Sequence, residues 1–235
     1  LAGLMVPQVA GTLLQNDRGG KGILLPGVPG VPPAEVVILG AGTFGAAAAR
    51  AFQGLGASVT ILDMDLNRLT QKSQEAVQAA QTRALRHGHP EVDGEHLLSA
   101  LLEQADGLAP RLLQRMGVDA EGLAREVERE LERRPRQTGL SMDRLNVSPR
   151  LVQLFERAET EQKRLKDEYV SVEHLLLAFI DEGKNSAAGR ALTSFGVDRD
   201  RFLEALTAVR GNQRVTSATP ESAYEALEKY GVDLV

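Results

Sequence analysis

The feature that most constrains this chain is an internal duplication. The segment VDGEHLLSALLEQ begins at Val92, and VSVEHLLLAFIDE begins at Val170, so the EHLL tetrapeptide recurs 78 residues later. Further on, MGVDAEGLAREV from Met116 returns as FGVDRDRFLEAL from Phe195, 79 residues later. A period of this length is too long for a solenoid repeat. Two copies therefore predict one pseudo-twofold helical domain, in which each half buries the apolar face of the other.

Each copy reads as helices throughout. The apolar residues of LLSALL at 97–102 recur at i, i+1, i+4 and i+5, and LLLAFI at 175–180 repeats that spacing, which is typical of a core-facing helical stripe. Residues 133–146 are the expected linker between a first repeat at about 67–134 and a second at about 146–213. Short polar side chains precede four of the expected helices, and we predict them as N-caps: Thr70, Asp93, Ser148 and Ser171.

Composition changes abruptly before the first repeat. Residues 1–66 hold 12 of the 23 glycines but only 3 of the 27 lysines and arginines. The rest of the chain is rich in charge. We interpret this break as the boundary between two segments of different origin, at 1–66 and from 67 onward.

A glycine motif follows a short apolar run in the first segment. EVVILGAGTFG places Gly40, Gly42 and Gly45 in G-x-G-x-x-G spacing, AAAARAF then favours a helix, and SVTILD ends a second strand at Asp63. In this order, the first glycine permits a tight turn, the second a close pyrophosphate and the third close helix–strand packing. The acid lies where it can accept hydrogen bonds from ribose hydroxyls. The segment is thus predicted as a partial Rossmann βαβ unit with strands buried on both faces, and NAD is its candidate cofactor.

The residues upstream of that motif add a resemblance. GGKGILLPGVPGVPPAEVVILGAGTFG resembles the NAD-binding domain of alanine dehydrogenases and their transhydrogenase relatives, over about residues 1–66. The resemblance implies that Gly40, Gly42, Gly45 and Asp63 contact NAD. The family's substrate-binding lysine and catalytic histidine have no counterpart in this sequence, so we expect no dehydrogenase activity. Two strands and one helix also leave apolar faces open, and we expect marginal stability and weak or absent NAD affinity.

The repeats carry a second resemblance. LTQKSQEAVQAAQTRAL, GEHLLSALL, MGVD and SVEHLLLA resemble the Clp N-terminal repeat family in its ClpB form, over about residues 67–235. The final VTSATPESAYEALEKYGVDL is similar to the helix that leads to the first ATPase module in that family, which predicts a lead-in helix at 214–235. The fold class is then mixed: an all-α, two-repeat bundle preceded by a partial Rossmann unit.

The second resemblance implies a module that captures unfolded or aggregated protein and has no catalysis of its own. By that resemblance, Thr70, Asp167 and Glu173 border the substrate-protein surface. The alternatives from the residues alone are a capping role for Thr70, a solvated face for Asp167 and a first-turn charge for Glu173. The sequence has no G-x-x-x-x-G-K-[ST] motif, so ATP hydrolysis is not expected of these residues, and Clp-family ATPase subunits are expected partners.

Four histidines could suggest other chemistry. His87 and His89 form H-x-H before Pro90, but no third ligand is fixed nearby in the sequence, so a solvated loop is expected and no metal site. His96 and His174 stand at matched positions beside core leucines. We expect both to be structural residues at helix N-termini rather than catalytic bases.

Composition excludes several classes of function. The net charge of −5 argues against general binding to nucleic acid, which needs a basic surface. The chain has no cysteine, which excludes disulfides, thiolate metal ligands and a cysteine nucleophile and fits a cytoplasmic protein. No apolar run is long enough to cross a membrane.

Four hypotheses for function remain open from the sequence. The first is a non-enzymatic chaperone module with a fused βαβ remnant, and the second is a fragment of an NAD-dependent, alanine dehydrogenase-like oxidoreductase. The third is a fused product without joint function, and the fourth an adaptor-binding platform. The lead-in ESAYEALEKYG favours the first over the fourth.

Overall fold

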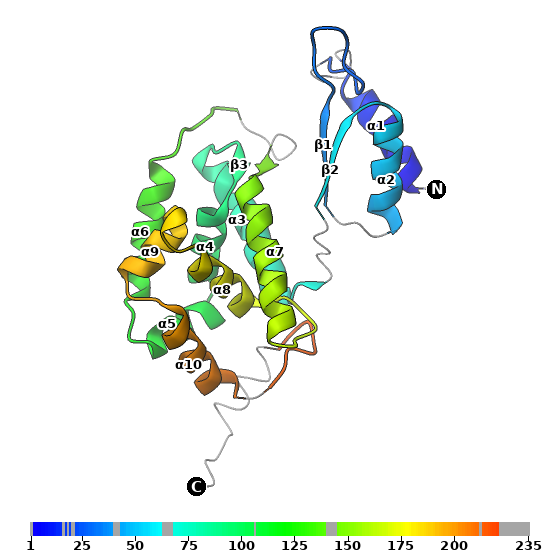
Figure 1. Cartoon of the computed structure of the whole chain (residues 1–235). Helices are drawn as coiled ribbons and strands as arrows, with labels where there is room; N and C mark the ends of the chain where they lie inside the picture. The colour runs from blue at the N-terminus through cyan, green and yellow to red at the C-terminus, as the bar shows by residue number, and fades with distance from the viewer. Residues whose placement is uncertain are drawn as a thin grey trace. The chain divides into compact units, whose positions relative to one another are not determined.

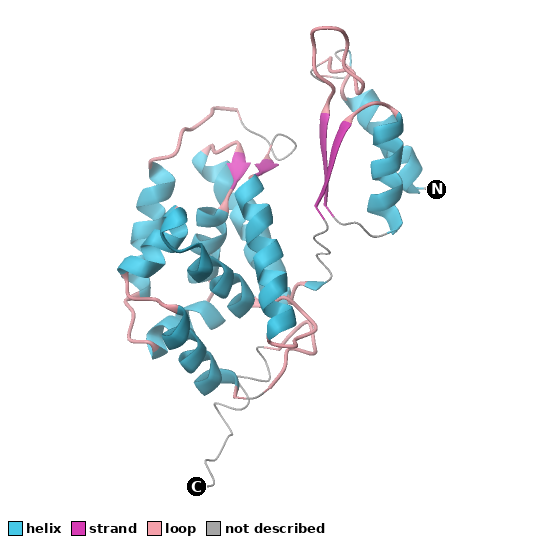
Figure 2. Ribbon diagram, in the orientation of Figure 1, coloured by secondary structure: helices cyan, strands magenta, loops and turns pink. Residues whose placement is uncertain are grey.

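The structure is a computed structural model that describes residues 2–15, 17, 19, 22–39, 43–62, 68–105, 107–139, 145–211 and 213–220. The chain divides into two compact units, Leu1–Asn67 and Arg68–Val235. We call them the N-terminal unit and the helical unit. Figure 1 follows each unit along the chain, and Figure 2 shows that strands are few and short.

The N-terminal unit contains a parallel strand pair joined by a helix. Strand β1 (Glu35–Leu39) leads through α2 (Thr43–Gly54) to β2 (Ser58–Leu62), and the strands pair in parallel from Glu35 opposite Ser58 to Leu39 opposite Leu62. This confirms the predicted strand–helix–strand order. The parallel direction follows from the helical crossover, because a short hairpin could only have made the strands antiparallel.

A further helix, α1 (Ala2–Leu13), packs on α2 and was not expected from the sequence, which suggested one helix. Pro7 stands inside α1 and obscured the pattern. Both helices lie on one side of the strand pair (Figure 1). Val36 and Ile38 of β1 are accordingly only half-buried. The expectation that the strands are buried on both faces is therefore wrong.

The first repeat of the helical unit contains four helices and one short strand. The second repeat also contains four helices, but its short strand precedes the first of them and a 3-10 turn follows the second. The elements of the first are α3 (Gln71–His87), β3 (Glu91–Val92), α4 (Gly94–Leu102), α5 (Leu108–Arg115) and α6 (Ala120–Glu132). Those of the second are β4 (Asn146–Val147), α7 (Pro149–Arg164), α8 (Val172–Glu182), η4 (Gly183–Asn185), α9 (Ala187–Ser194) and α10 (Arg199–Arg210).

The four predicted N-caps are confirmed. Thr70 and Ser148 open α3 and α7 and accept backbone hydrogen bonds from Ser73 and Leu151. Asp93 and Ser171 open α4 and α8, and each forms a capping box in which a histidine three residues later bonds back to the backbone of the cap. His96 and His174 therefore have the structural role expected of them, because each satisfies a helix N-terminal donor.

The core lies along the two EHLL helices. Every residue of α4 is buried, and so are most residues of α8, so these two helices are covered on all sides by the others. Leu97, Leu101 and Phe179 are among the largest side chains that are fully buried. A helix that is buried on all sides lies in the interior of a domain, and its few polar side chains need partners there.

Short parallel pairings join the two repeats, although we expected helices throughout. β4, which precedes the first helix of the second repeat, pairs with β3 of the first repeat. At the equivalent position, Leu69, which precedes the first helix of the first repeat, pairs with Val170 of the second. The residues that lead into each repeat thus pair with the backbone of the other repeat, as the pseudo-twofold relation requires.

The chain after α10 is extended rather than helical where the structure describes it. Residues 213–220 fold back against the loop that follows α7, and the side chain of Val215 is fully buried there. In Figure 1 this stretch is the orange-red trace beside the end of α7. Residues 221–235 lie outside the described residues, so the lead-in helix there stays a prediction.

Candidate functional site

The predicted dinucleotide site falls mostly outside the described residues. Gly40, Gly42 and Asp63 are among the residues that the structure does not describe. Gly45 lies in the first turn of α2 and is half-buried. Phe44, beside it, is 66% exposed. NAD contact by these residues therefore stays a prediction.

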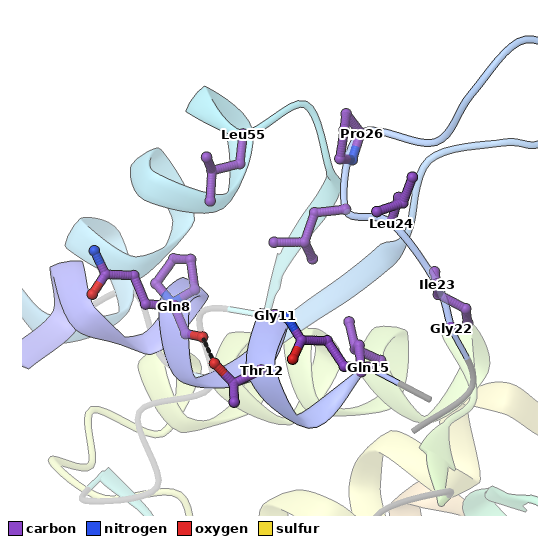
Figure 3. Close-up of a pocket in the computed structure, with 12 residues that line it drawn as sticks. Gln8, Gly11, Thr12, Gln15, Gly22, Ile23, Leu24, Pro26 and Leu55 are labelled. Carbon is purple, nitrogen blue, oxygen red and sulfur yellow. Dashed lines mark hydrogen bonds between the residues drawn. The ribbon is translucent and has the colours of Figure 1, made fainter. Parts of the chain in front are cut away.

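The N-terminal unit has a pocket of about 730 Å³ between α1 and the loop at 22–26 (Figure 3). Gln8, Thr12 and Gln15 supply its polar side chains, and the Thr12 hydroxyl already donates to the Gln8 carbonyl at 2.9 Å. The residues that line it include no charged side chain and no member of the glycine motif. The pocket is thus apolar and lacks the groups that would balance a pyrophosphate.

Thr70 is a buried cap. Its side chain accepts from the Ser73 amide at 3.4 Å and lies 3.0 Å from the Ser73 hydroxyl. Its own amide donates to the Val170 carbonyl at 3.0 Å. Thr70 therefore lies where the leading residues of the first repeat meet the second repeat, and no part of it is exposed.

Asp167 and Glu173 share one arginine. Nη1 of Arg210 donates to Asp167 Oδ2 at 2.9 Å and to Glu173 Oε1 at 3.0 Å. Asp167 is 5% exposed and Glu173 is fully buried, so the solvated face considered for Asp167 is wrong. The structure brings these two predicted site residues together in the interior, where each charge needs its partner.

Asp167 is held by three residues. Besides Arg210, the His174 Nε2 lies 3.0 Å from its Oδ2, and the Val215 amide donates to its Oδ1 at 2.8 Å. Burial by itself raises the pKa of this carboxyl, but the hydrogen bonds from His174, Val215 and Arg210 outweigh it, so its pKa falls below the ordinary value. Asp167 is therefore a structural anion that joins α8, α10 and the chain that leaves α10.

Ser171, His174 and Asp167 are arranged in a hydrogen-bonded row that resembles a hydrolase triad, but the geometry does not support catalysis. Ser171 Oγ lies 2.8 Å from His174 Nδ1, and the Ser171 amide donates to that same nitrogen at 2.9 Å. The remaining ring proton points at Asp167. The nitrogen that would act as a base is already occupied, and Ser171 and His174 are fully buried.

The first repeat balances its buried acids with two arginines. Arg134 and Arg150 both reach Asp93 and Glu95, and Glu95 also accepts from the Ala188 amide at 3.3 Å. Burial raises the pKa of Asp93, but bonds from Arg134, Ser148 and Gly94 and the charge of Arg150 lower it overall. Because Arg150 and Ala188 belong to the second repeat, this cluster ties the two repeats together.

A histidine stands in the first repeat where the second has Asp167. His89 Nδ1 lies 2.8 Å from His96 Nε2, and His87 stacks on His89 with ring centroids 5.3 Å apart. His89 is 2% exposed, so the solvated loop expected for it is wrong. Burial, with nearby charges, lowers the pKa of His89 to about 4 and that of His96 to about 3.

The hydrogen bonds of these histidines assign their protons. The Asp93 amide donates to His96 Nδ1 at 3.0 Å, so the His96 proton is on Nε2 and points at His89 Nδ1. The His89 proton is then on Nε2, which is buried without a partner. Across the described part of the chain, no three side chains of His, Asp or Glu converge as metal ligands.

The sequence reasoning missed Arg210 and the burial of His89. Both could have been found by aligning the repeats, because His89 stands opposite Asp167 at an offset of 78, and Leu131 stands opposite Arg210 at 79. The second repeat thus has Asp167 and Arg210 where the first has His89 and Leu131.

Comparison with known families gives a direct result for the helical unit. A model of the family described as the Clp repeat (R) N-terminal domain matches residues 68–195, more than half of the chain. The chain belongs to the Clp N-terminal repeat family. This agrees with the duplication, the paired capping boxes and the exchanged leading residues.

Curated relatives in this family are bacterial ClpB chaperones. Chaperone protein ClpB of Bacillus anthracis is 49% identical over 174 residues, and that of Nitratidesulfovibrio vulgaris is 48% identical over 174 residues. Each match covers 73% of this chain and 20% of the relative, so the chain spans about a fifth of the length of these proteins.

Solved structures show the same fold. The N-terminal domain of Hsp104 from Candida albicans superposes with a TM-score of 0.57 at 22% identity, over 65% of this chain and 98% of that domain. The N-domain of ClpV from Vibrio cholerae gives 0.52 at 19% identity, over 64% and 88%. The helical unit thus has a fold that distant Clp proteins share.

The N-terminal part has its own match. A model of the family described as the alanine dehydrogenase/PNT C-terminal domain matches residues 6–118. This bears out the resemblance of the first segment, although the match extends beyond the unit boundary at Asn67 into the first repeat. In the described residues, no helix is long and apolar enough to cross a membrane.

Proposed function

We propose that the helical unit is a protein-binding module that captures unfolded or aggregated polypeptide for ATP-dependent disaggregation by a Clp-type motor. The observation that carries this proposal is the 49% identity to a ClpB chaperone over 174 residues. It is supported by the two-repeat fold, which the N-terminal domains of distant Clp proteins share. Cytoplasmic location and partnership with Clp ATPase subunits are part of the same proposal.

The buried positions of Thr70, Asp167 and Glu173 shape this proposal. None of these side chains is a free surface group, since all three are 5% exposed or less. They lie instead along the seam where the leading residues 68–70, the loop at 166–170 and the residues after α10 meet. A client at this seam would find extended backbone on both sides, which favours recognition by added main-chain hydrogen bonds.

Binding to unfolded casein tests the proposal. The whole chain and the fragment 68–235 are each titrated with fluorescently labelled casein, and anisotropy reports the Kd. We expect both to bind with similar affinity and native ribonuclease, a folded control, not to bind. If neither form binds casein at micromolar concentrations, the chaperone proposal fails.

The N-terminal unit supports a second candidate, an NAD-binding remnant. The specific observation is the parallel β1–β2 pair with its crossover helix, together with the alanine dehydrogenase/PNT match. A ligand that binds only the folded state raises the melting temperature. We therefore expect a rise with millimolar NAD if Gly40, Gly42, Gly45 and Asp63 form a site, and the variant Asp63→Ala should reduce it. If NAD does not shift the melting temperature of the unmodified chain or of the variant, the dehydrogenase-type candidate fails. The hypothesis of a fused segment without joint function then remains.

A further inference from the structure

The seam at the predicted site is already occupied by the chain itself. Residues 213–220, which we call the strap, run across the loop at 166–168. The Glu168 amide donates to the Val215 carbonyl at 2.8 Å, and the Val215 amide donates to Asp167 Oδ1 at 2.8 Å. The Gln71 amide, at the start of α3, donates to the Ala218 carbonyl at 2.7 Å.

Most side chains of the strap are exposed, and Val215 and Pro220 are buried. Val215 is fully buried, whereas Arg214 and Thr216 on either side of it are exposed. Arg214 donates to the Lys166 carbonyl. One aliphatic anchor with backbone bonds on both flanks is the way an extended peptide adds to an edge. Apart from the side chains of Val215 and Arg214, the bonds described for the strap come from its backbone.

The strap covers the groups that the proposed function assigns to client binding. The Val215 amide donates a hydrogen bond to Asp167, and the Ala218 carbonyl accepts one from the amide of Gln71, the residue next to Thr70. The first repeat has a much lighter contact at the equivalent place, where the Gln137 amide donates to the Gly88 carbonyl at 2.7 Å. The second repeat therefore holds its outgoing chain by additional bonds, and Asp167 is the residue that distinguishes the two.

We propose that the strap is a built-in competitor for an extended-peptide site. An unfolded polypeptide with an aliphatic side chain displaces residues 213–220, places that side chain in the slot of Val215 and takes over the bonds to Glu168, Asp167 and Gln71. Client capture and release of the outgoing chain are then one event. This proposal rests on the proposed chaperone function and adds its regulation.

Weakening the strap tests the competition. In the whole chain, Val215→Ala removes buried aliphatic surface but keeps every backbone bond, so the fold is retained while the strap is held less tightly. Loss of part of a buried valine shifts such an equilibrium by about 5–10-fold, so the Kd for labelled casein is expected to fall by up to that factor. Val215→Asp is expected to lower the Kd further. Thr216→Asp introduces the same charge at the exposed neighbouring residue and is the matched control, so its Kd should equal that of the unmodified chain.

Hydrogen exchange gives a readout that does not depend on any variant. Saturating casein should accelerate exchange of the Val215 amide in the unmodified chain, because its acceptor Asp167 passes to the client, while amides of α8 keep their protection. The outcomes are separable. If the unmodified chain does not bind casein, the proposed function fails. If it binds, but Val215→Ala binds equally or more weakly and the Val215 amide stays protected, the strap is only structural and this inference is overturned.

Discussion

The two repeats share one backbone plan but balance their buried acids in different ways. In the first repeat, Glu95 is held by Arg134 and Arg150, and the neighbouring position is the neutral ring of His89. In the second repeat, Glu173 shares Arg210 with Asp167. Both repeats keep the capping box at the N-terminus of the buried helix, but the charges around it differ: two arginines face two acids in the first repeat, and one arginine faces two acids in the second.

The largest effect should come from removing the shared arginine. Arg210→Leu copies Leu131 of the first repeat but leaves two buried carboxylates without a cation, and breaking a buried pair in this way costs about 3–5 kcal/mol. Urea unfolding measures the change. Adding Asp167→His, which copies His89, should recover part of the loss, because one of the two charges is removed.

A matched surface control separates charge from burial. Arg129→Leu on α6 removes an arginine that is 62% exposed and paired with Glu126 at 2.9 Å, and its cost should stay within about 0.5 kcal/mol. Equal costs for Arg129→Leu and Arg210→Leu would contradict the view that Arg210 neutralises an interior cluster.

Acid should destabilise the first repeat before the second. The pKa of His89 is about 4 and that of His96 about 3 in the folded chain, below 6.5 when unfolded, so the unfolded state binds more protons between these values. The free energy of unfolding should therefore fall as pH drops below about 6.5, by up to about 1.4 kcal/mol per pH unit for each histidine. Because the pKa of Asp167 is lowered in the folded chain, this carboxylate stabilises the fold above its ordinary pKa of 3.8. That stabilisation is lost only as the pH falls below 3.8.

The variant His89→Asn tests this assignment. Its side-chain oxygen can accept the hydrogen bond from His96 in place of Nδ1, but it does not titrate. Urea unfolding between pH 4 and 7 should then show a slope reduced by about half relative to the unmodified chain. An unchanged slope would mean that other groups carry the pH dependence.

The two opening caps should differ by a smaller amount. Ser148 Oγ accepts from the Leu151 amide at 3.0 Å and also donates to Asp93 at 2.7 Å, whereas the Thr70 hydroxyl bonds to Ser73 within its own helix start. We expect Ser148→Ala to cost about 2 kcal/mol and Thr70→Ala about 1 kcal/mol in unfolding free energy. The reverse order would show that the bond across the repeats contributes little.

The smallest effect should come from Glu182. Burial raises the pKa of Glu182 despite its bonds and nearby arginines, and Gln104 stands at the equivalent place in the first repeat. Because the folded state resists ionisation of this carboxyl, its contribution is lost as pH rises. Glu182→Gln should be neutral or stabilising by about 0.5 kcal/mol at pH 7, measured by urea unfolding, and the difference should shrink at lower pH. A clear loss of stability would show that the charge is needed by Arg157 or Arg150.

Local chemistry explains why much of the fold could be predicted. The N-caps Thr70, Asp93, Ser148 and Ser171 act on the backbone within three residues, so their role is visible in the sequence. The 78-residue offset fixed which helices correspond. The parallel direction of β1 and β2 followed from the length of the crossover between them.

The candidate site could not be placed in the same way, because its contacts join residues far apart in sequence. Asp167 and Arg210 are 43 residues apart, and Glu95 meets Arg150 at 55. Nothing local distinguishes a buried carboxylate such as Glu173 from a first-turn surface charge. The exchange of His89 and Leu131 for Asp167 and Arg210 is the one sequence signal of this network, and it appears only when the repeats are compared.

The exchanged leading strands have a consequence for how such a chain can be joined to others. The Val170 amide donates to the Arg68 carbonyl, so the second repeat fixes the position at which the helical unit begins. Any segment that precedes residue 68 therefore joins the helical unit at a residue whose position is held by a hydrogen bond from the second repeat. An unrelated neighbour can therefore be spliced on upstream without disturbing the bundle, provided that the splice leaves these few residues intact.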